Sequence, residues 1–340
     1  MTTATREQTE PARRAIGVRS KAPVFVLGCP RSGTTLLYHM LLSAGGFAVY
    51  RAESQAFNLL APRFGNFKSR ANRERLLESW LRSKLFQVSG LTAAKIRDRI
   101  LQQCDGAGDF LQTYMQEIVR QQGAERWAEC TPDHLLYMQE IKRQIPEALV
   151  IHIIRDGRDV ALSYARQGWA RNLPWDRGQE LLVSAAYWDW TVRRGRERGA
   201  ALGAEYMEVR YEELVSAPKE TLSGVGRFIG QELDYDHIQK VGIGSVSKPN
   251  SSFSAEQGFH PVGRWQEKMR PEQLAAVEMV IGDLLQELGY PLSDEPRTKR
   301  SMRVSAMRAL YPRLFAAKLW LKDHTWLGRT ANLGPLEIQD

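Results

Sequence analysis

The stretch PVFVLGCPRSGTT at residues 23–35 decides the fold class. Its apolar run Val24–Leu27 ends at Gly28, a pattern typical of a buried strand in a parallel sheet. Residues 34–44 then carry apolar side chains at helical spacing and stop at Gly45 and Gly46. A strand, a glycine-bounded loop and a helix in this order open a nucleotide-binding α/β unit.

The loop at residues 28–33 has the composition of an anion site. Its glycines leave room beside the backbone, the following helix begins with unpaired N–H groups, and Ser32, Thr34 and Thr35 add hydroxyl donors. The spacing resembles the nucleoside-triphosphate loop G-x-x-x-x-G-K-[ST], but Thr34 occupies the lysine position and the cation is Arg31. A P-loop kinase or hydrolase would lose its phosphate-binding lysine by this change and is the weaker alternative. The other alternative is an ordinary strand–turn–helix corner.

The pattern repeats along the chain. Further strands are predicted at 148–154 and 205–210, each followed by a helix, the first from about Val160. Residues 70–125 are mostly helical in pattern, 242–264 predict a long loop, and 271–288 predict an amphipathic helix closed by Gly289. Alternating strands and helices predict a three-layer α/β domain with a central parallel sheet.

A charged turn follows the second buried strand. It contains Arg155 and Arg158 in the sequence RDGRD at residues 155–159, with Ser163 eight positions after Arg155. Ligands of open α/β sheets collect at this carboxyl edge, so Arg155 and Ser163 are candidates for a second phosphate contact. Alternatively, both arginines pair with Asp156 and Asp159 on a solvated turn. The presence of the first loop favours the anion site.

Together, CPRSGTT at 29–35 and RDGRD with Ser163 resemble the two cofactor motifs of sulfotransferases that use 3′-phosphoadenosine 5′-phosphosulfate (PAPS). The resemblance continues through Tyr211–Leu214 and 263–265, and it is strongest to the tyrosylprotein and Golgi-carbohydrate types. It implies a P-loop-NTPase-like sulfotransferase fold and release of 3′-phosphoadenosine 5′-phosphate (PAP) as product.

The resemblance also implies roles for individual residues. The loop residues would wrap the 5′-phosphosulfate: Pro30, Arg31, Ser32, Gly33, Thr34 and Thr35. Arg155 and Ser163 would hold the 3′-phosphate, and Tyr211 would lie on the adenine side of the site. Ser252 and Arg264 would close over the 3′-phosphate.

Catalysis of sulfuryl transfer needs a base for the acceptor proton and a cation for the leaving phosphate. Arg31 is the candidate cation. Glu53, 22 residues after Arg31, is the candidate base, because it resembles the acidic base of tyrosylprotein-type enzymes and follows a predicted short second strand. A surface carboxylate near Arg51 is the alternative.

The segment ECTPDH at 129–134 offers a competing base in His134, although a lone histidine there more often begins a helix. Many relatives carry a catalytic lysine where this chain has Cys130, which supplies no positive charge. Arg31 therefore acts alone or another basic residue replaces the lysine.

Composition restricts the partners. The 340 residues carry 47 Lys and Arg against 39 Asp and Glu, a net charge of +8 that favours an anionic partner. The basic residues are scattered, which argues against nucleic acid as that partner. Three cysteines without ligand spacing predict neither a metal site nor a disulfide framework, and the start of the chain lacks a signal-peptide core. We therefore expect a cytoplasmic enzyme.

We expect three regions: a disordered tail at 1–21, a sulfotransferase domain at 22–295 and a helical extension at 296–340. The basic, apolar-faced helix at 300–327 packs on the domain by default, with a homodimer contact and a peripheral membrane contact as alternatives.

The predicted reaction is sulfuryl transfer from PAPS by in-line displacement. The acceptor is a hydroxyl, or less favourably an amine, of a small molecule or lipid. A non-catalytic phosphoadenosine-binding module is the remaining alternative. The insertion between Arg51 and Glu129 is expected to supply the acceptor pocket, because the cofactor motifs lie elsewhere. Its aromatic residues would suit an apolar or aromatic acceptor, or alternatively form core: Phe57, Phe64, Phe67, Trp80 and Phe86.

Overall fold

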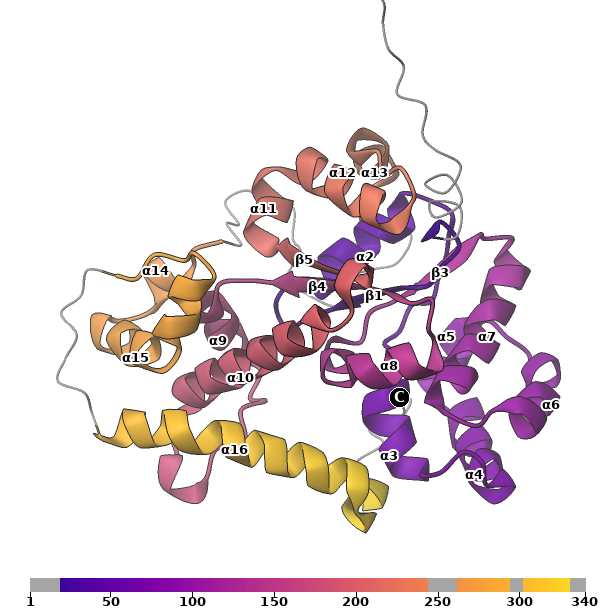
Figure 1. Cartoon of the computed structure of the whole chain (residues 1–340), viewed down its shortest axis with the longest axis horizontal. Coiled ribbons are helices and arrows are strands. Elements are labelled where there is room, and N and C mark those ends of the chain that lie inside the picture. Colours follow the sequence, from indigo (N-terminus) through magenta and orange to yellow (C-terminus); the bar gives the residue numbers. More distant parts are fainter. Residues whose placement is uncertain (1–18, 244–261, 294–301, 331–340) are drawn as a thin grey trace, which may run out of the picture.

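Five parallel strands form the central sheet in the computed structural model, which describes residues 19–243, 262–293 and 302–330 (Figure 1). Their order within these ranges is β2-β3-β1-β4-β5. The strands are β1 (Val24–Leu27), β2 (Phe47–Ala48), β3 (Arg126–Glu129), β4 (Leu149–Ile154) and β5 (Tyr206–Arg210). The predicted α/β fold with a parallel sheet is confirmed, and so are its strands at β1, β4 and β5.

Helices cover both faces of the sheet because its inner strands are apolar at consecutive positions. Val26 and Ile151 point to one face, and Phe25 and Val150 point to the other, all of them fully buried. On the first face lie α2 (Thr34–Ser43), α11 (Tyr211–Ser216), α12 (Pro218–Ile229) and α13 (Tyr235–Val241) (Figure 1). The opposite face carries α7 (Ala107–Gln122), α8 (Met138–Gln144) and α10 (Glu180–Ala200).

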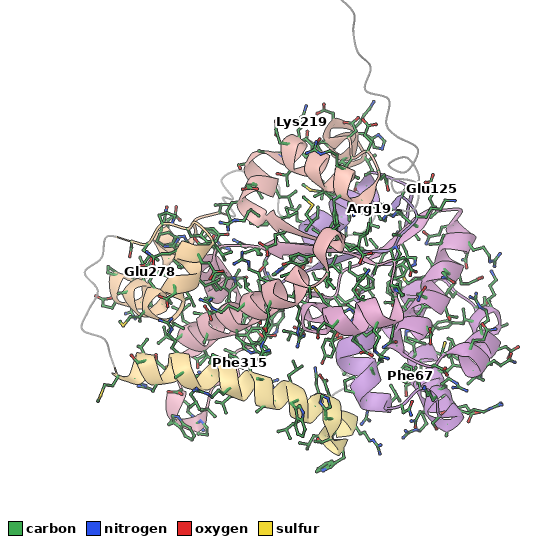
Figure 2. The ribbon with its side chains drawn as sticks, viewed as in Figure 1. Arg19, Phe67, Glu125, Lys219, Glu278 and Phe315 are labelled. Carbon is green, nitrogen blue, oxygen red and sulfur yellow. The ribbon has the colours of Figure 1, made fainter. Side chains whose placement is uncertain are left out.

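Two further groups of helices extend this core. An insertion between β2 and β3 contributes η1 (Ala56–Leu60), α3 (Ala61–Phe64), α4 (Arg70–Leu81), α5 (Lys84–Ser89) and α6 (Ala93–Gln103). Beside α10 lie α9 (Gly157–Arg166), α15 (Pro271–Glu287) and α16 (Met302–His324), and α14 (Trp265–Lys268) packs on α9. The aromatic side chains of the insertion pack into the core: Phe57, Phe64, Phe67 and Trp80 are each at most 5% exposed, and Phe86 packs on Trp80 (Figure 2). Phe57 and Phe67 also line a cavity of 680 Å³ beside α3.

Two elements differ from the sequence-based expectation. Strand β3 carries charged residues at both ends, so no apolar run marks it, yet Arg126 is buried and donates to the carbonyl oxygens of Ala22 and Ile229. Helix α9 begins at Gly157, before the expected start near Val160. The Asp156 carboxylate accepts a hydrogen bond from the Arg158 N–H (2.9 Å) and thereby caps the helix. Of the expected long loop at 242–264, residues 244–261 lie outside the described ranges.

The C-terminal helix α16 packs across α10 and α15, which is the default role predicted for it (Figure 1). Val304, Met307 and Tyr311 are its buried side chains. The Tyr311 hydroxyl donates to Asp176 (3.0 Å) and accepts from the Leu173 N–H (3.1 Å), which ties the helix to the loop before α10. None of the helices in the described part of the chain is both long enough and apolar enough to cross a bilayer.

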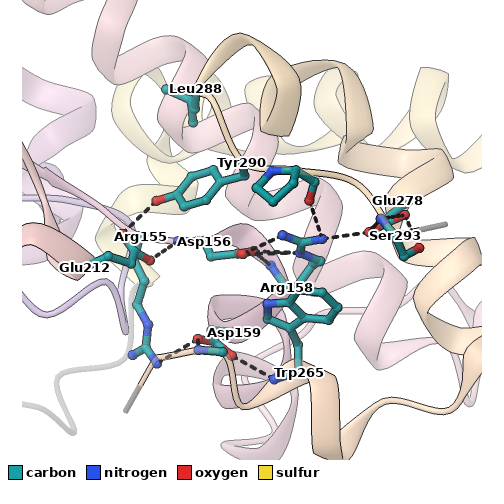
Figure 3. A network of polar contacts seen from close by, with 12 residues as sticks. Arg155, Asp156, Arg158, Asp159, Glu212, Trp265, Glu278, Leu288, Tyr290 and Ser293 are labelled. Carbon is teal, nitrogen blue, oxygen red and sulfur yellow. Dashed lines mark hydrogen bonds and ion pairs between the residues drawn. The ribbon is translucent and has the colours of Figure 1, made fainter. Parts of the chain in front are cut away.

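A buried ion-pair network holds the turn after β4 (Figure 3). Arg158 is 1% exposed and pairs with Asp156 and Glu278, each at 2.7 Å. Its guanidinium also lies 3.7 Å from the centroid of the Trp265 ring. The solvated-turn interpretation is therefore wrong for Arg158, which is buried, although its pairing with Asp156 was correctly anticipated.

Replacing Arg158 with alanine should lower the free energy of unfolding by about 3 kcal/mol, because two buried carboxylates lose their counter-charge. Arg70→Ala is the matched control. It removes an exposed i,i+4 pair with Glu74 and should cost less than about 1 kcal/mol. Urea denaturation of both variants measures the difference, and equal losses would contradict this account.

Candidate functional site

The candidate site lies where the parallel strands end. The loop at 28–33 follows β1, Cys130 follows β3, Arg155 follows β4 and Tyr211 follows β5. Because the strands are parallel, these four positions share one edge of the sheet, the edge at which ligands of open α/β sheets bind.

The loop after β1 has a strained backbone and little spare space. Arg31 and Gly33 have φ angles of 76° and 100°, in the left-handed region that L side chains rarely adopt. A Cβ at Gly33 would lie 2.2 Å from the Tyr211 ring, so only glycine fits there. Ser32 is buried, and its hydroxyl has no hydrogen-bond partner in the described structure. A buried, unsatisfied hydroxyl in a constrained loop before a helix is suited to an anionic ligand.

Two arginines and a serine from separate motifs meet beside this loop. Nε of Arg31 donates to the Ser163 hydroxyl (2.9 Å), and Nη1 of Arg155 donates to the Arg31 carbonyl oxygen (3.3 Å). The Arg155 guanidinium also lies 4.5 Å from the centroid of the Tyr211 ring. Burial, and then the charge of Arg155, lower the pKa of Arg31. Two cations this close favour binding of an anion between or beside them.

Asp159 organises the far side of the site. It pairs with Arg155 (3.4 Å) and accepts hydrogen bonds from the N–H groups of Gly263 (2.9 Å) and Trp265 (3.0 Å) (Figure 3). This brings Arg264 next to Ser163, and both residues line one 20 Å³ cavity.

Of the other residues predicted to bind the cofactor, three lie at the loop or the first turn of α2, and one is outside the described residues. Pro30 and Thr35 are partly exposed at the loop and at the first turn of α2, and Thr34 is buried there. Ser252 lies outside the described residues.

Glu53, the candidate base, lies in the segment after β2 and is partly buried, whereas the alternative interpretation places it exposed on the surface. Burial raises the pKa of Glu53 to about 7, with help from the charges of Glu129 and Asp133. Its carboxylate accepts a hydrogen bond from the Gln55 side-chain amide (2.7 Å). A carboxylate with a pKa near 7 is suited to accept a proton at neutral pH.

Sequence reasoning missed the part that Glu129 plays. It is 2% exposed and accepts hydrogen bonds from the Ser54 hydroxyl (2.7 Å), the Thr131 N–H (3.1 Å) and the His134 ring (3.1 Å). Burial works to raise the pKa of Glu129, but the His134 ring, Thr131 and Ser54 outweigh it and hold the pKa at about 2. Glu129 is thus a fixed negative charge near Glu53.

His134 and Cys130 contribute no base or cation in this arrangement. Nε2 of His134 accepts from the Phe57 N–H (3.2 Å) and Nδ1 contacts Glu129, so both ring nitrogens are engaged in a fully buried side chain. Burial keeps the pKa of the Cys130 thiol well above its usual value, so this side chain remains neutral.

Glu53→Gln should stabilise the protein at pH 8 by about 1 kcal/mol or more, and this gain should vanish near pH 4.5. The raised pKa means that the folded state retains a proton that the unfolded chain loses between about pH 4.5 and 7, so wild-type stability falls across that window. Chemical denaturation at several pH values measures the effect. The exposed Glu147→Gln should show no such pH dependence. A stabilisation that is constant with pH would contradict the prediction.

Comparisons with known proteins identify similar sequences and folds. Residues 23–235 match the model described as "Sulfotransferase family". Carbohydrate sulfotransferase 1 of Danio rerio is 27% identical over 120 residues, which are 34% of this chain and 29% of that protein. Carbohydrate sulfotransferase 7 of Mus musculus is 25% identical over 152 residues, 42% of this chain and 27% of that protein. The chain therefore spans less than a third of the length of either relative.

Among solved structures, the sulfotransferase domain of the Synechococcus PCC 7002 olefin synthase is similar in fold. Its TM-score is 0.57 at 18% identity, covering 80% of this chain and 96% of that domain.

Proposed function

This chain belongs to the sulfotransferase family, and from that premise we propose that it transfers a sulfuryl group from PAPS to a hydroxyl of a small organic or lipid acceptor. The observation that carries the proposal is the meeting of Arg31, Arg155 and Ser163 beside the strained loop after β1. These residues come from two motifs 120 positions apart, and their charges suit a ligand with two separate anionic groups.

The residues present fit such a nucleotide. The unsatisfied Ser32 hydroxyl and the N-terminus of α2 would receive its 5′ end, with Arg31 at the leaving phosphate. Arg155, Ser163 and Arg264 would receive the 3′-phosphate, and Ser252 belongs to the same proposal by resemblance. Tyr211, packed against both Gly33 and Arg155, would lie beside the adenosine.

Glu53 would act as the general base. When bound, PAPS would supply the sulfuryl group for the acceptor oxygen, with PAP as the leaving group that keeps the electron pair of the broken bond. Glu53 takes the hydroxyl proton, and its pKa of about 7 is what this task requires. Glu129 would be a positioning residue, because its negative charge helps to keep the pKa of Glu53 high. With a neutral thiol at Cys130, Arg31 would supply the positive charge at the leaving group, while Arg155 would stay with the 3′-phosphate.

Two alternatives have weaker support. A P-loop kinase or hydrolase needs the phosphate lysine that Thr34 replaces, and the family match does not favour it. A phosphoadenosine-binding module without turnover would have no need for a carboxylate whose pKa is poised near neutrality.

Thermal-shift measurements with PAP, with ATP and magnesium, and with NAD test the nucleotide. Of the three nucleotides, only PAP should raise the melting temperature of the protein. Arg155→Gln should weaken PAP binding about 10- to 100-fold, since one charge-assisted contact is lost. Arg70→Gln, on the surface of α4, should bind PAP like the wild type. Selective stabilisation by ATP with magnesium would refute the assignment.

The general base is tested by Glu53→Gln, which should lower sulfuryl transfer from labelled PAPS by at least about 100-fold and leave the PAP affinity within about twofold. Glu147→Gln serves as the control and should retain full activity. Loss of PAP binding together with activity would show that Glu53 acts in binding or folding, and unchanged activity would exclude it as the base.

A further inference from the structure

A cavity of 520 Å³ lies between α16 and the helices α9 and α10. Seven of its lining residues are aromatic, and their rings pack on one another: Tyr187 contacts Tyr164 (5.1 Å between centroids) and Phe315 of α16 (5.3 Å). Figure 2 shows Phe315 on the α16 ribbon alongside α10. The volume is that of a small-molecule pocket, and the walls suit a flat apolar or aryl body.

The cavity adjoins the proposed sulfuryl-transfer site at two points. Its wall includes Trp169, whose ring centroid lies 6.0 Å from the guanidinium carbon of Arg31. It also includes Asp133, whose charge contributes to the raised pKa of Glu53. Tyr164, also in the wall, directly follows Ser163 in α9. A molecule in this cavity would therefore lie close to Arg31, with Asp133 of the cavity wall coupled to Glu53 by charge.

The charged residues of the cavity are mostly positive. Arg171, Lys318 and Lys322 line it, against the single carboxylate of Asp133. Across residues 19–243, 262–293 and 302–330, no acidic side chain lies within 4.0 Å of the charged nitrogens of these three cations. Asp323, the acidic neighbour of Lys322 in sequence, instead accepts a hydrogen bond from the Tyr137 hydroxyl (2.8 Å). The surplus of cations favours an anionic ligand.

We propose that this cavity is the acceptor site and that it takes a hydroxylated aryl compound carrying a carboxylate or phosphate group. The aryl body would pack among the rings, and the lysines of α16 would bind the anionic group. This proposal rests on the proposed function, because a cavity can be an acceptor site only if the protein transfers a sulfuryl group. It assigns acceptor choice to α16, at residues 302–324, beyond the 23–235 range of the family match and away from the 51–129 insertion.

The test uses two probes of similar shape, 6-hydroxy-2-naphthoate and the neutral 6-hydroxy-2-naphthalenemethanol, titrated calorimetrically into the full chain. The naphthoate should bind about tenfold more tightly, and Lys318→Gln/Lys322→Gln should reduce this preference to less than about twofold. Arg313→Gln, an exposed cation of the same helix outside the cavity, should retain the wild-type preference. Melting temperature and PAP affinity, measured on every variant, report on folding.

In turnover with labelled PAPS, the double lysine variant should raise KM for the naphthoate about tenfold and leave kcat unchanged. Equal binding of both probes, no binding of either, or a preference that survives the double variant would overturn the inference. PAP binding without naphthoate binding would overturn the inference about the cavity and leave the proposed function standing. Naphthoate binding with the expected preference but without PAP binding would support the cavity's chemistry and refute the proposed function.

Discussion

The buried pairing of Arg158 with Asp156 and Glu278 is the constraint on which the candidate site depends (Figure 3). It engages the Asp156 carboxylate, which also caps α9, so the same residues hold both the turn after β4 and the start of the helix. With Asp156 engaged in this way, Arg155 extends toward the loop after β1 and contacts Arg31 and Asp159. The two arginines of the sequence RDGRD therefore have different roles. Arg158 holds the turn, and Arg155 faces the candidate site.

A second constraint is electrostatic. Glu129 is ionised inside the protein because Ser54, Thr131 and His134 all donate to it. Its charge then disfavours ionisation of Glu53 close by. Two carboxylates with pKa values of about 2 and 7 in one site divide the roles, with one as a permanent charge and the other as a group that exchanges protons near neutral pH.

Much of the fold was predictable because its strands β1 and β4 are apolar runs bounded by glycine or charge. Strand β3 was not, since the hydrogen bonds that satisfy Arg126 come from Ala22 and Ile229, far away in sequence. The meeting of Arg31, Arg155 and Ser163 followed from parallel strands ending at one edge. The aromatic residues of the insertion and those under α16 look alike in sequence. Only packing shows that Trp80 of the insertion fills a core, while Trp169 under α16 lines a cavity.

The position of α16 has a consequence for how such a protein changes over generations. In the proposed function, the nucleotide is bound by the strand ends and their loops, whereas one wall of the aromatic cavity is the helix α16, which packs mainly on α10 and α15. Substitutions of the α16 residues that line the cavity would change its wall and leave in place the residues proposed to bind the donor. Under the proposed function, related proteins that differ in the 23 residues of this helix would accept different molecules and share one sulfuryl-transfer site.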